Sequence, residues 1–148
     1  MEVTGGCLCK AVRYQITAPP MTTRVCWCRV CQYLAAGNGT VNVCFPSNAV
    51  TIEGQLADYS LVAESGNVMH RRFCPKCGTQ MFSEAESRPH LIFVRAGTLD
   101  DREIAKPAAT IWVSEAPTWA CMDDKIPRIE RQPPAPQHSL LTVGPGQP

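Results

Sequence analysis

Three tight groups of cysteines constrain this chain more than any other feature of its sequence. They have the patterns C-x-C, C-x-C-x-x-C and C-x-x-C, and their members are, in that order, Cys7 and Cys9; Cys26, Cys28 and Cys31; and Cys74 and Cys77. Thiolates at such short spacings can face a single metal ion, and zinc is the ion that clustered cysteines most often hold in structural sites. We therefore expect a fold that is organised around zinc.

The number of cysteines argues against a disulfide-bonded scaffold. Nine cysteines is an odd number, and the first segment, MEVTGGCLCKAVRY, lacks the charged and then apolar pattern of a secretory signal. A secreted disulfide scaffold usually has an even number of cysteines and such a signal. We therefore expect a cytoplasmic protein whose cysteines are reduced and bind metal.

Composition and charge limit the partners of the chain. Hydrophobic residues make up 45% of the 148 residues and charged residues 18%, which is typical of one globular domain. The net charge is +1 and the basic residues are scattered, so the sequence lacks the basic stripe that binds a phosphate backbone. No apolar run approaches the roughly 20 residues that span a bilayer. We expect neither nucleic acid nor a membrane as a partner.

Short segments of alternating apolar and polar residues predict an all-β fold. In residues 11–17, Val12, Tyr14 and Ile16 would lie on one face of a strand, and Arg13 and Gln15 on the other. Further strands are predicted at residues 40–45, 49–54, 57–62, 67–73, 91–97 and 110–115. No segment has a convincing helical period over the length of a helix.

The remaining segments are less regular. About one helical turn is predicted at residues 32–36, ended by Gly37. From Gln132 onward, Pro and Gly become frequent and no apolar period remains, which is typical of a tail without a fold of its own. We therefore divide the chain into a zinc-binding domain, residues 1–131, and a Pro/Gly-rich tail, residues 132–148.

Two pairings of the cysteine groups would complete a site of four thiolates. The C-x-x-C pair is followed by no predicted helix, so it suits metal ligation better than a thioredoxin-like redox site. Its partners are either Cys28 and Cys31, as in a zinc ribbon with a long insertion, or Cys7 and Cys9. The second pairing uses every clustered cysteine and leaves three thiols as a separate group. Spacing favours it without excluding the first.

Four segments, in this order, resemble the family of glutathione-dependent formaldehyde-activating enzymes and its centromere-protein-V-like relatives: GGCLCKAVRY, CWCRVCQ, RFCPKCGT and AGTLDD. The resemblance extends from about residue 5 to about residue 129. It implies a β-tent of several short antiparallel sheets with two zinc ions, one structural and one catalytic with an open position. Carried over by motif, the structural ligands would be Cys7, Cys9, Cys74 and Cys77, and the catalytic ligands Cys26, Cys28 and Cys31.

The resemblance also implies a carbon–sulfur lyase. Three thiolates on zinc suit a sulfur ligand, and a substrate thiol at such a site would be a thiolate near neutral pH. That thiolate would add to a small aldehyde and give an S-hydroxymethyl thioether, or the reverse reaction would occur. In the family the thiol is glutathione and the aldehyde is formaldehyde, so we expect a small-molecule thiol and an aldehyde as substrates.

The chain departs from the family at three positions. Trp27 stands where many relatives have His between the first two cysteines of the group of three. Lys10 stands where a Gly often follows the C-x-C motif, and Thr110 where relatives frequently have His. Neither the group of three cysteines nor the late strand therefore supplies an imidazole near the second metal. His70 and His90 are not placed by these motifs, and proton transfer in the addition need not involve a dedicated side chain.

A second hypothesis is a non-catalytic module, namely a binding or chaperone-like domain with two closed zinc sites. Cys44, Cys121 or a histidine such as His70 or His90 would then complete the second site. The sequence favours simpler roles, because an isolated cysteine is most often a small apolar filler and His70 lies in a predicted strand. The two hypotheses differ in whether the second metal keeps an open position.

Several further residues have structural interpretations. Trp112 and Trp119 lie in apolar runs and are expected in the core. Arg71 and Arg72 are expected on a solvated strand face, although they could attract a carboxylate-bearing thiol such as glutathione. Trp27, between two expected ligands, would either form a pocket wall or pack in the interior.

Overall fold

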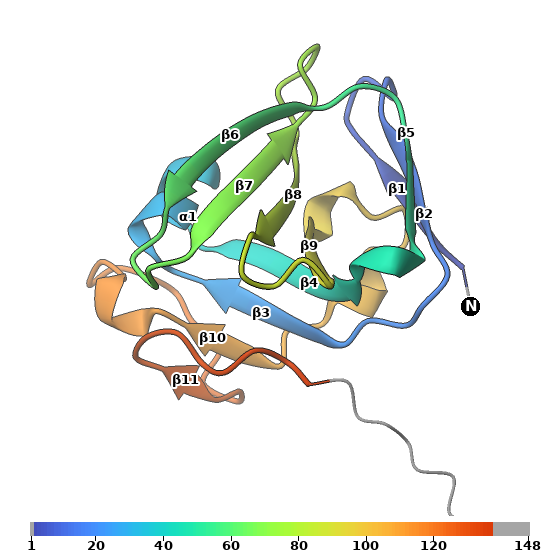
Figure 1. Cartoon of the computed structure of the whole chain (residues 1–148). Coiled ribbons are helices and arrows are strands. Elements are labelled where there is room, and N and C mark those ends of the chain that lie inside the picture. Colours follow the sequence, from blue (N-terminus) through green and yellow to red (C-terminus); the bar gives the residue numbers. More distant parts are fainter. Residues whose placement is uncertain (1, 138–148) are drawn as a thin grey trace, which may run out of the picture.

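Two β-sheets build most of the computed structural model, which describes residues 2–137 (Figure 1). The strands are β1 (Val3–Gly6), β2 (Arg13–Ile16), β3 (Thr22–Cys26), β4 (Thr40–Pro46), β5 (Val50–Glu53), β6 (Ala57–Val62), β7 (Val68–Phe73), β8 (Gln80–Ala85), β9 (Leu91–Arg95), β10 (Ala109–Ile111) and β11 (Arg128–Ile129). The smaller sheet has the order β1-β2-β5, and the larger has the order β11-β10-β3-β4-β9-β8-β7-β6. The all-β prediction is confirmed, and the arrangement is consistent with a β-tent.

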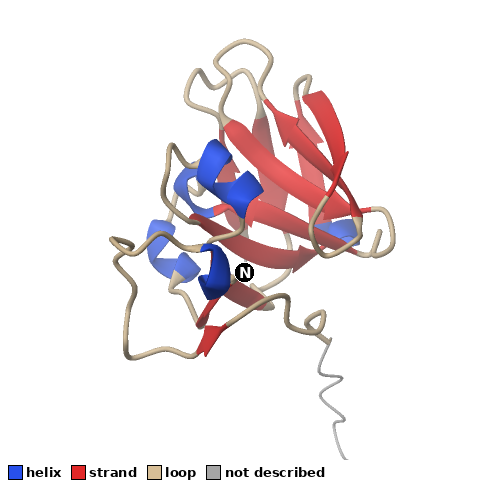
Figure 2. Cartoon of the chain, turned by 90° about the vertical axis from the view of Figure 1, so that its left-hand side faces the viewer, coloured by secondary structure: helices blue, strands red, loops and turns tan. Residues whose placement is uncertain are grey.

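Helical segments are short and lie in the connections between strands (Figure 2). They are the α-helix α1 (Arg29–Leu34) and the 3-10 turns η1 (Ser47–Ala49), η2 (Ala96–Thr98), η3 (Arg102–Ala105) and η4 (Val113–Glu115). The predicted helical turn at residues 32–36 therefore exists, but it begins three residues earlier, before Cys31. Gly37 follows the helix with φ of 99°, a left-handed conformation that suits glycine.

Each of the seven predicted strand segments contains a strand, but the last is shorter than predicted. β10 ends at Ile111, because Trp112 takes a left-handed conformation with φ of 57° and η4 follows. β10 also pairs parallel with β3 and with β11, whereas the other pairings are antiparallel. The sequence analysis missed β1, β3, β8 and β11, which lack a clear alternation of apolar and polar residues.

The hydrophobic core lies between the two sheets and confirms the predicted alternation in β2. Val12, Tyr14 and Ile16 are buried, whereas Gln15 is exposed. The ring of Tyr14 meets that of Phe82 edge-on, with 5.3 Å between the ring centroids. This geometry is favourable for two aromatic rings and joins the small sheet to the large one.

Strand β4 lies inside the large sheet, with β3 and β9 on its two edges, and side chains on both of its faces are buried. Val43 and Phe45 belong to the core between the sheets. Successive side chains of a strand point to opposite faces, so Asn42 and Cys44 lie on the other side. Cys44 is fully buried there, as expected of a small apolar filler.

The AGTLDD segment anchors the first strand. The Tyr14 hydroxyl and the Thr98 hydroxyl lie 2.9 Å apart in a hydrogen bond, and the Asp100 carboxylate accepts hydrogen bonds from Thr4 and Arg13. A Cβ atom at Gly5 would lie 2.2 Å from the Tyr14 hydroxyl oxygen. The close approach of these segments therefore requires glycine at this position.

The start of the predicted tail lies against the domain. Trp112 Nε1 donates a hydrogen bond to Gln132 Oε1 at 2.9 Å, and Arg24 donates one to the carbonyl oxygen of Pro134. Residues 138–148 lie outside the described residues, so the division of the chain at residue 131 stays a prediction. Among the described residues, no helix is long and apolar enough to cross a membrane.

Candidate metal centres and the adjoining pocket

The structure brings the C-x-C and C-x-x-C groups together in one cluster. Cys7, Cys9, Cys74 and Cys77 have their sulfur atoms within 4.8 Å of one another. Neighbouring sulfurs lie 3.6 Å apart for Cys7 and Cys9, and 3.8 Å apart for Cys9 and Cys74. Four sulfurs about 2.3 Å from one zinc ion in a tetrahedron lie about 3.8 Å from each other. The cluster therefore fits a closed tetrahedral zinc site, and the zinc-ribbon pairing is not the one that forms.

Two tight turns present these four sulfurs. In the first turn, Lys10 N donates to Cys7 O at 3.1 Å, and Val12 N points at the Cys7 sulfur at 3.2 Å. In the second, Gly78 N donates to Cys74 O at 2.8 Å, and Gly78 has φ of 75°. Lys10 occupies the corresponding left-handed region with φ of 66°, which costs a residue with a Cβ about 1–2 kcal/mol. Glycine would fit this position without that cost.

Hydrogen bonds at the second turn favour the thiolate of Cys77. The hydroxyl and the backbone N–H of Thr79 lower the pKa of the Cys77 thiol to about 5. The hydroxyl oxygen lies 3.1 Å from the sulfur. Donors aimed at sulfur stabilise the thiolate, which is the form that binds metal.

The second cluster lies at the end of β3 and the start of α1. Cys26 is the last residue of β3, Cys28 is the N-cap of α1, and Cys31 lies in its first turn. The Cys28 sulfur accepts a hydrogen bond from Cys31 N at 3.4 Å. The short helix thus turns the three sulfurs toward one point, within 4.8 Å of one another.

Trp27 and Gln32 hold the segment of the three cysteines in place through hydrogen bonds to the backbone. Trp27 is only 1% exposed and packs in the interior, so it is not a wall of the pocket described below. Its backbone N–H donates to Ile111 O at 3.0 Å, and its carbonyl oxygen accepts from Gln32 Nε2 at 2.8 Å. Gln32 also donates to the carbonyl oxygen of Glu115 at 3.0 Å. These contacts hold the cysteines between β10 and the helix.

Within residues 2–137, no other His, Cys, Asp or Glu joins the three-cysteine cluster. Cys44 is buried elsewhere in the sheet, and Cys121 is exposed, so it is not the apolar filler that was expected. His70 lies on β7 between Asp58 and Glu86, with ring nitrogens 2.7 and 2.8 Å from their carboxylates. The cluster offers three sulfur ligands and no fourth ligand of these types from the described chain.

The three thiols of this cluster share their protons unequally. Hydrogen bonds from Cys26 and Cys28, with a smaller contribution from the charge of Arg95, lower the pKa of Cys31 to about 2. Cys28 and Cys31 raise the pKa of Cys26, because a second thiolate beside the first is unfavourable. One thiolate therefore forms readily, and a bound cation would be needed to hold all three in that form.

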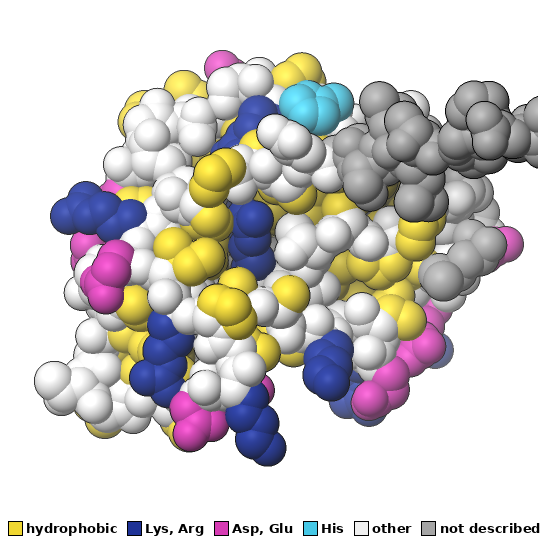
Figure 3. Space-filling view, turned by 90° about the horizontal axis from the view of Figure 1, so that it is seen from below, with side chains coloured by type: hydrophobic (Ala, Val, Ile, Leu, Met, Phe, Trp, Pro, Cys, Tyr) yellow, Lys and Arg dark blue, Asp and Glu magenta, His cyan; other side chains and the backbone are white. Residues whose placement is uncertain are grey.

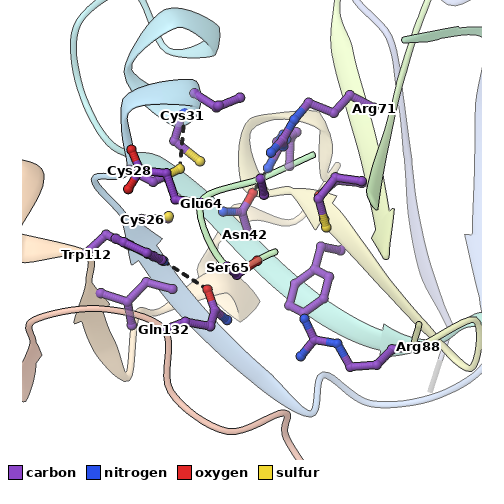
Figure 4. Close-up of a pocket in the computed structure, with 17 residues that line it drawn as sticks. Cys26, Cys28, Cys31, Asn42, Glu64, Ser65, Arg71, Arg88, Trp112 and Gln132 are labelled. Carbon is purple, nitrogen blue, oxygen red and sulfur yellow. Dashed lines mark hydrogen bonds between the residues drawn. The ribbon is translucent and has the colours of Figure 1, made fainter. Parts of the chain in front are cut away.

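A pocket opens beside the three cysteines, over one face of the large sheet (Figure 4). Arg71 and Arg88 reach into it from the side opposite the cysteines, and Asn42 lies between. Arg95 lines the pocket as well and donates a hydrogen bond to Asn42 Oδ1. Apolar side chains complete the walls, among them Met69, Phe93, Ile111 and Trp112.

Arg71 and Arg95 are buried, with exposed fractions of 6% and 7%. The expectation of a solvated strand face is therefore wrong for Arg71, whereas Arg72 lies on the other face and pairs with Glu84 at 3.4 Å. Burial lowers the pKa of Arg95, and the neighbouring cysteines act in the opposite direction. The sequence analysis missed Arg95 as a pocket residue. Its position directly after the apolar segment LIFV was a signal that this arginine could be buried.

Charged and hydrophobic side chains are mixed on the outer surface. On the face seen from below, acidic and basic side chains are scattered among hydrophobic ones (Figure 3). Trp119 is 70% exposed, so its assignment to the core is wrong, whereas Trp112 is buried as expected. Trp119 follows η4 in an irregular segment that has no strand to cover it.

Comparisons with known proteins identify a family and a similar fold. The family model described as glutathione-dependent formaldehyde-activating enzyme matches residues 2–115. A Halomonas elongata protein provisionally named a glutathione-dependent formaldehyde-activating enzyme is 23% identical over 132 residues, covering 84% of this chain and 83% of its own. The crystal structure of a Rhodobacter sphaeroides protein has a TM-score of 0.54 at 16% identity, covering 84% of this chain and 98% of that one. This last likeness supports the fold.

Proposed function

Because the chain belongs to the family of glutathione-dependent formaldehyde-activating enzymes, we propose that it is a zinc-dependent carbon–sulfur lyase. It would add a glutathione-like thiol to a small aldehyde and give an S-hydroxyalkyl thioether, or catalyse the reverse. The observation that carries the proposal is the cluster of Cys26, Cys28 and Cys31, which opens into a pocket and has no fourth protein ligand among the described residues. We assign the four-cysteine cluster described above to a structural zinc ion.

The donor set fits zinc at the second cluster. Zinc held by three thiolates keeps one position for an exogenous ligand and lowers the pKa of a thiol that binds there. Cys26 and Cys31 are buried and Cys28 is half-buried, so the cluster would meet a substrate mainly on the Cys28 side. The guanidinium of Arg95 offsets the negative charge of the three sulfurs.

The reaction needs no oxidant or reductant. The thiol loses its proton, its sulfur forms a bond with the aldehyde carbon, and the carbonyl oxygen takes up a proton. Within residues 2–137 no histidine lines the pocket, so water would supply that proton. The positive charge of Arg95, which lines the pocket, would stabilise the developing negative charge on the carbonyl oxygen.

An exchange experiment tests the proposed function. Zinc-loaded protein, carbon-13-labelled formaldehyde and glutathione would be followed by NMR exchange spectroscopy, which separates catalysed from spontaneous interconversion. We expect the protein to accelerate exchange and Cys28→Ser to return it to the spontaneous rate. Cys121→Ser is the matched control, because Cys121 is exposed and belongs to neither cluster. A folded Cys28→Ser variant with full activity would refute the catalytic assignment.

The non-catalytic alternative remains an outcome of this test. It requires a closed second site, and neither Cys44, Cys121, His70 nor His90 joins the cluster. Dependence on reduced glutathione would be consistent with the expected cytoplasmic location.

A further inference from the structure

We propose that the buried guanidinium groups of Arg71 and Arg95 form a carboxylate-binding subsite beside the three cysteines. The carbonyl substrate would then be a short aldehyde acid, in which a carboxylate is bonded to the aldehyde carbon as in glyoxylate. This inference rests on the proposed lyase function and replaces its neutral aldehyde with an anionic one.

Unpaired donors in the pocket are the first argument. Arg71 Nε, Arg95 Nε and Arg95 Nη2 are buried and have no hydrogen-bond partner within the described part of the chain. A buried guanidinium without an acceptor is costly, because each donor loses its contacts with water. A carboxylate matches the planar fork of guanidinium donors and would satisfy them.

The charge in the pocket is the second argument. Arg71, Arg88 and Arg95 line the pocket, and no carboxylate of the described residues forms an ion pair with them. With zinc bound, the ion and three thiolates together carry one negative charge, and Glu64 at the rim carries a second. Three guanidinium groups therefore leave one positive charge before the thiol binds and balance the substrate thiolate once it is bound, so the pocket has no excess negative charge to repel a monocarboxylate.

The register of the sheet places the two buried arginines near each other. Asn42 on β4 pairs with Arg95 on β9, Phe93 on β9 pairs with Ser83 on β8, and Ser83 pairs with Arg71 on β7. Arg71 thus lies two strands away from Arg95 on the lining of the same pocket. A carboxylate held by both would lie in the pocket that the three cysteines also line.

The size of the pocket favours a short ligand. Its cavity volume is about 90 Å³, several times the roughly 10–15 Å³ that one water molecule needs. Formaldehyde has no charge and would leave the buried guanidinium groups unsatisfied. The carboxylates of glutathione are separated from its sulfur by peptide groups, so they suit the rim near Arg88 better than the buried arginines.

The step is balanced for an aldehyde acid. The thiolate sulfur forms a bond with the aldehyde carbon, the π electrons of the carbonyl move to its oxygen, and that oxygen takes up a proton. The carboxylate stays intact and serves only to orient the carbon toward the sulfur. The product is an S-(carboxyhydroxymethyl) thioether.

Calorimetric titration of the zinc-loaded protein with glyoxylate tests the subsite directly. We expect saturable binding of glyoxylate and, for Arg71→Gln, binding weakened about tenfold or more, as loss of a charge-assisted hydrogen bond predicts. Arg72→Gln is the matched control, since it removes the neighbouring charge on the opposite face and should bind normally. Because Arg71 is buried, each variant is first checked by thermal unfolding. Arg88→Gln, at the half-buried rim outside the subsite, should weaken glyoxylate binding by a few fold at most, because it removes one positive charge from the pocket.

Glyoxylate binding that is absent, or that is equal in the wild type and Arg71→Gln, would overturn the subsite, whatever the effect of Arg71→Gln on glutathione binding. Adduct formation with glutathione separates this inference from the proposed function. Acceleration with formaldehyde but not with glyoxylate would refute the aldehyde acid alone, whereas acceleration with neither would refute the lyase, and the titration would still decide the subsite.

Discussion

Replacement of Cys74 by Ser should destabilise the protein far more than replacement of Cys28 by Ser. Cys74 is completely buried within the core between the sheets and lies in the four-cysteine cluster. Structural zinc contributes on the order of 10 kcal/mol to folding, whereas the net stability of a domain is about 5–15 kcal/mol. Loss of one ligand from the closed site should therefore remove most of the net stability, about 5 kcal/mol or more.

The expected cost of Cys28→Ser is about 1 kcal/mol or less. Cys28 is half-buried and caps α1 by accepting a hydrogen bond from Cys31 N. Serine is among the preferred N-cap residues and can accept the same hydrogen bond. The substitution therefore keeps the local fold and removes a single sulfur from the second cluster.

Urea unfolding followed by tryptophan fluorescence, together with zinc content by mass spectrometry, checks both values. We expect two zinc ions per chain in the wild type, a folded Cys28→Ser variant with weakened binding of the second ion, and an unfolded or strongly destabilised Cys74→Ser variant. The assignment of the two clusters is refuted if Cys74→Ser unfolds within about 1 kcal/mol of the wild type, or if Cys28→Ser is equally damaging.

Three further perturbations follow from local geometry. Lys10→Gly should raise the free energy of unfolding by up to about 1 kcal/mol, because it relieves the left-handed conformation while adding freedom to the unfolded chain; urea unfolding that shows a loss would contradict this account. Glu86 and Asp58 raise the pKa of His70, so its stabilising effect is present below the unfolded pKa of about 6.5 and is lost as pH rises through the folded pKa. The thermal midpoint of the wild type should exceed that of His70→Gln at pH 5–6 but not at pH 9, and a constant difference would exclude this linkage. Phe82→Ala should cost about 3–5 kcal/mol in urea unfolding, since Phe82 is fully buried; a cost below about 1 kcal/mol would show that the site collapses or is less packed.

The sequence by itself determined the features that depend on neighbours along the chain. The alternation of Val12, Tyr14 and Ile16 predicts the strand and its buried face, because the side chains of a strand alternate with a period of two. The short spacing of Cys26, Cys28 and Cys31 similarly predicts that their sulfurs can face one metal ion, and these sulfurs lie within 4.8 Å of one another. Local geometry is enough for both conclusions.

Tertiary structure alone decided which distant segments meet. The approach of β1 to the turn after β7 brings Cys7 and Cys74 into one cluster. The spacing of the cysteines in the sequence left this pairing of the groups open. Arg71 and Arg72 are adjacent in sequence, but the sheet buries Arg71 in the pocket that adjoins the second cluster and leaves Arg72 paired with a carboxylate. Burial of a charge depends on what the rest of the chain packs against it, so no local period encodes it. The charge that we propose selects the substrate is therefore a property of the fold.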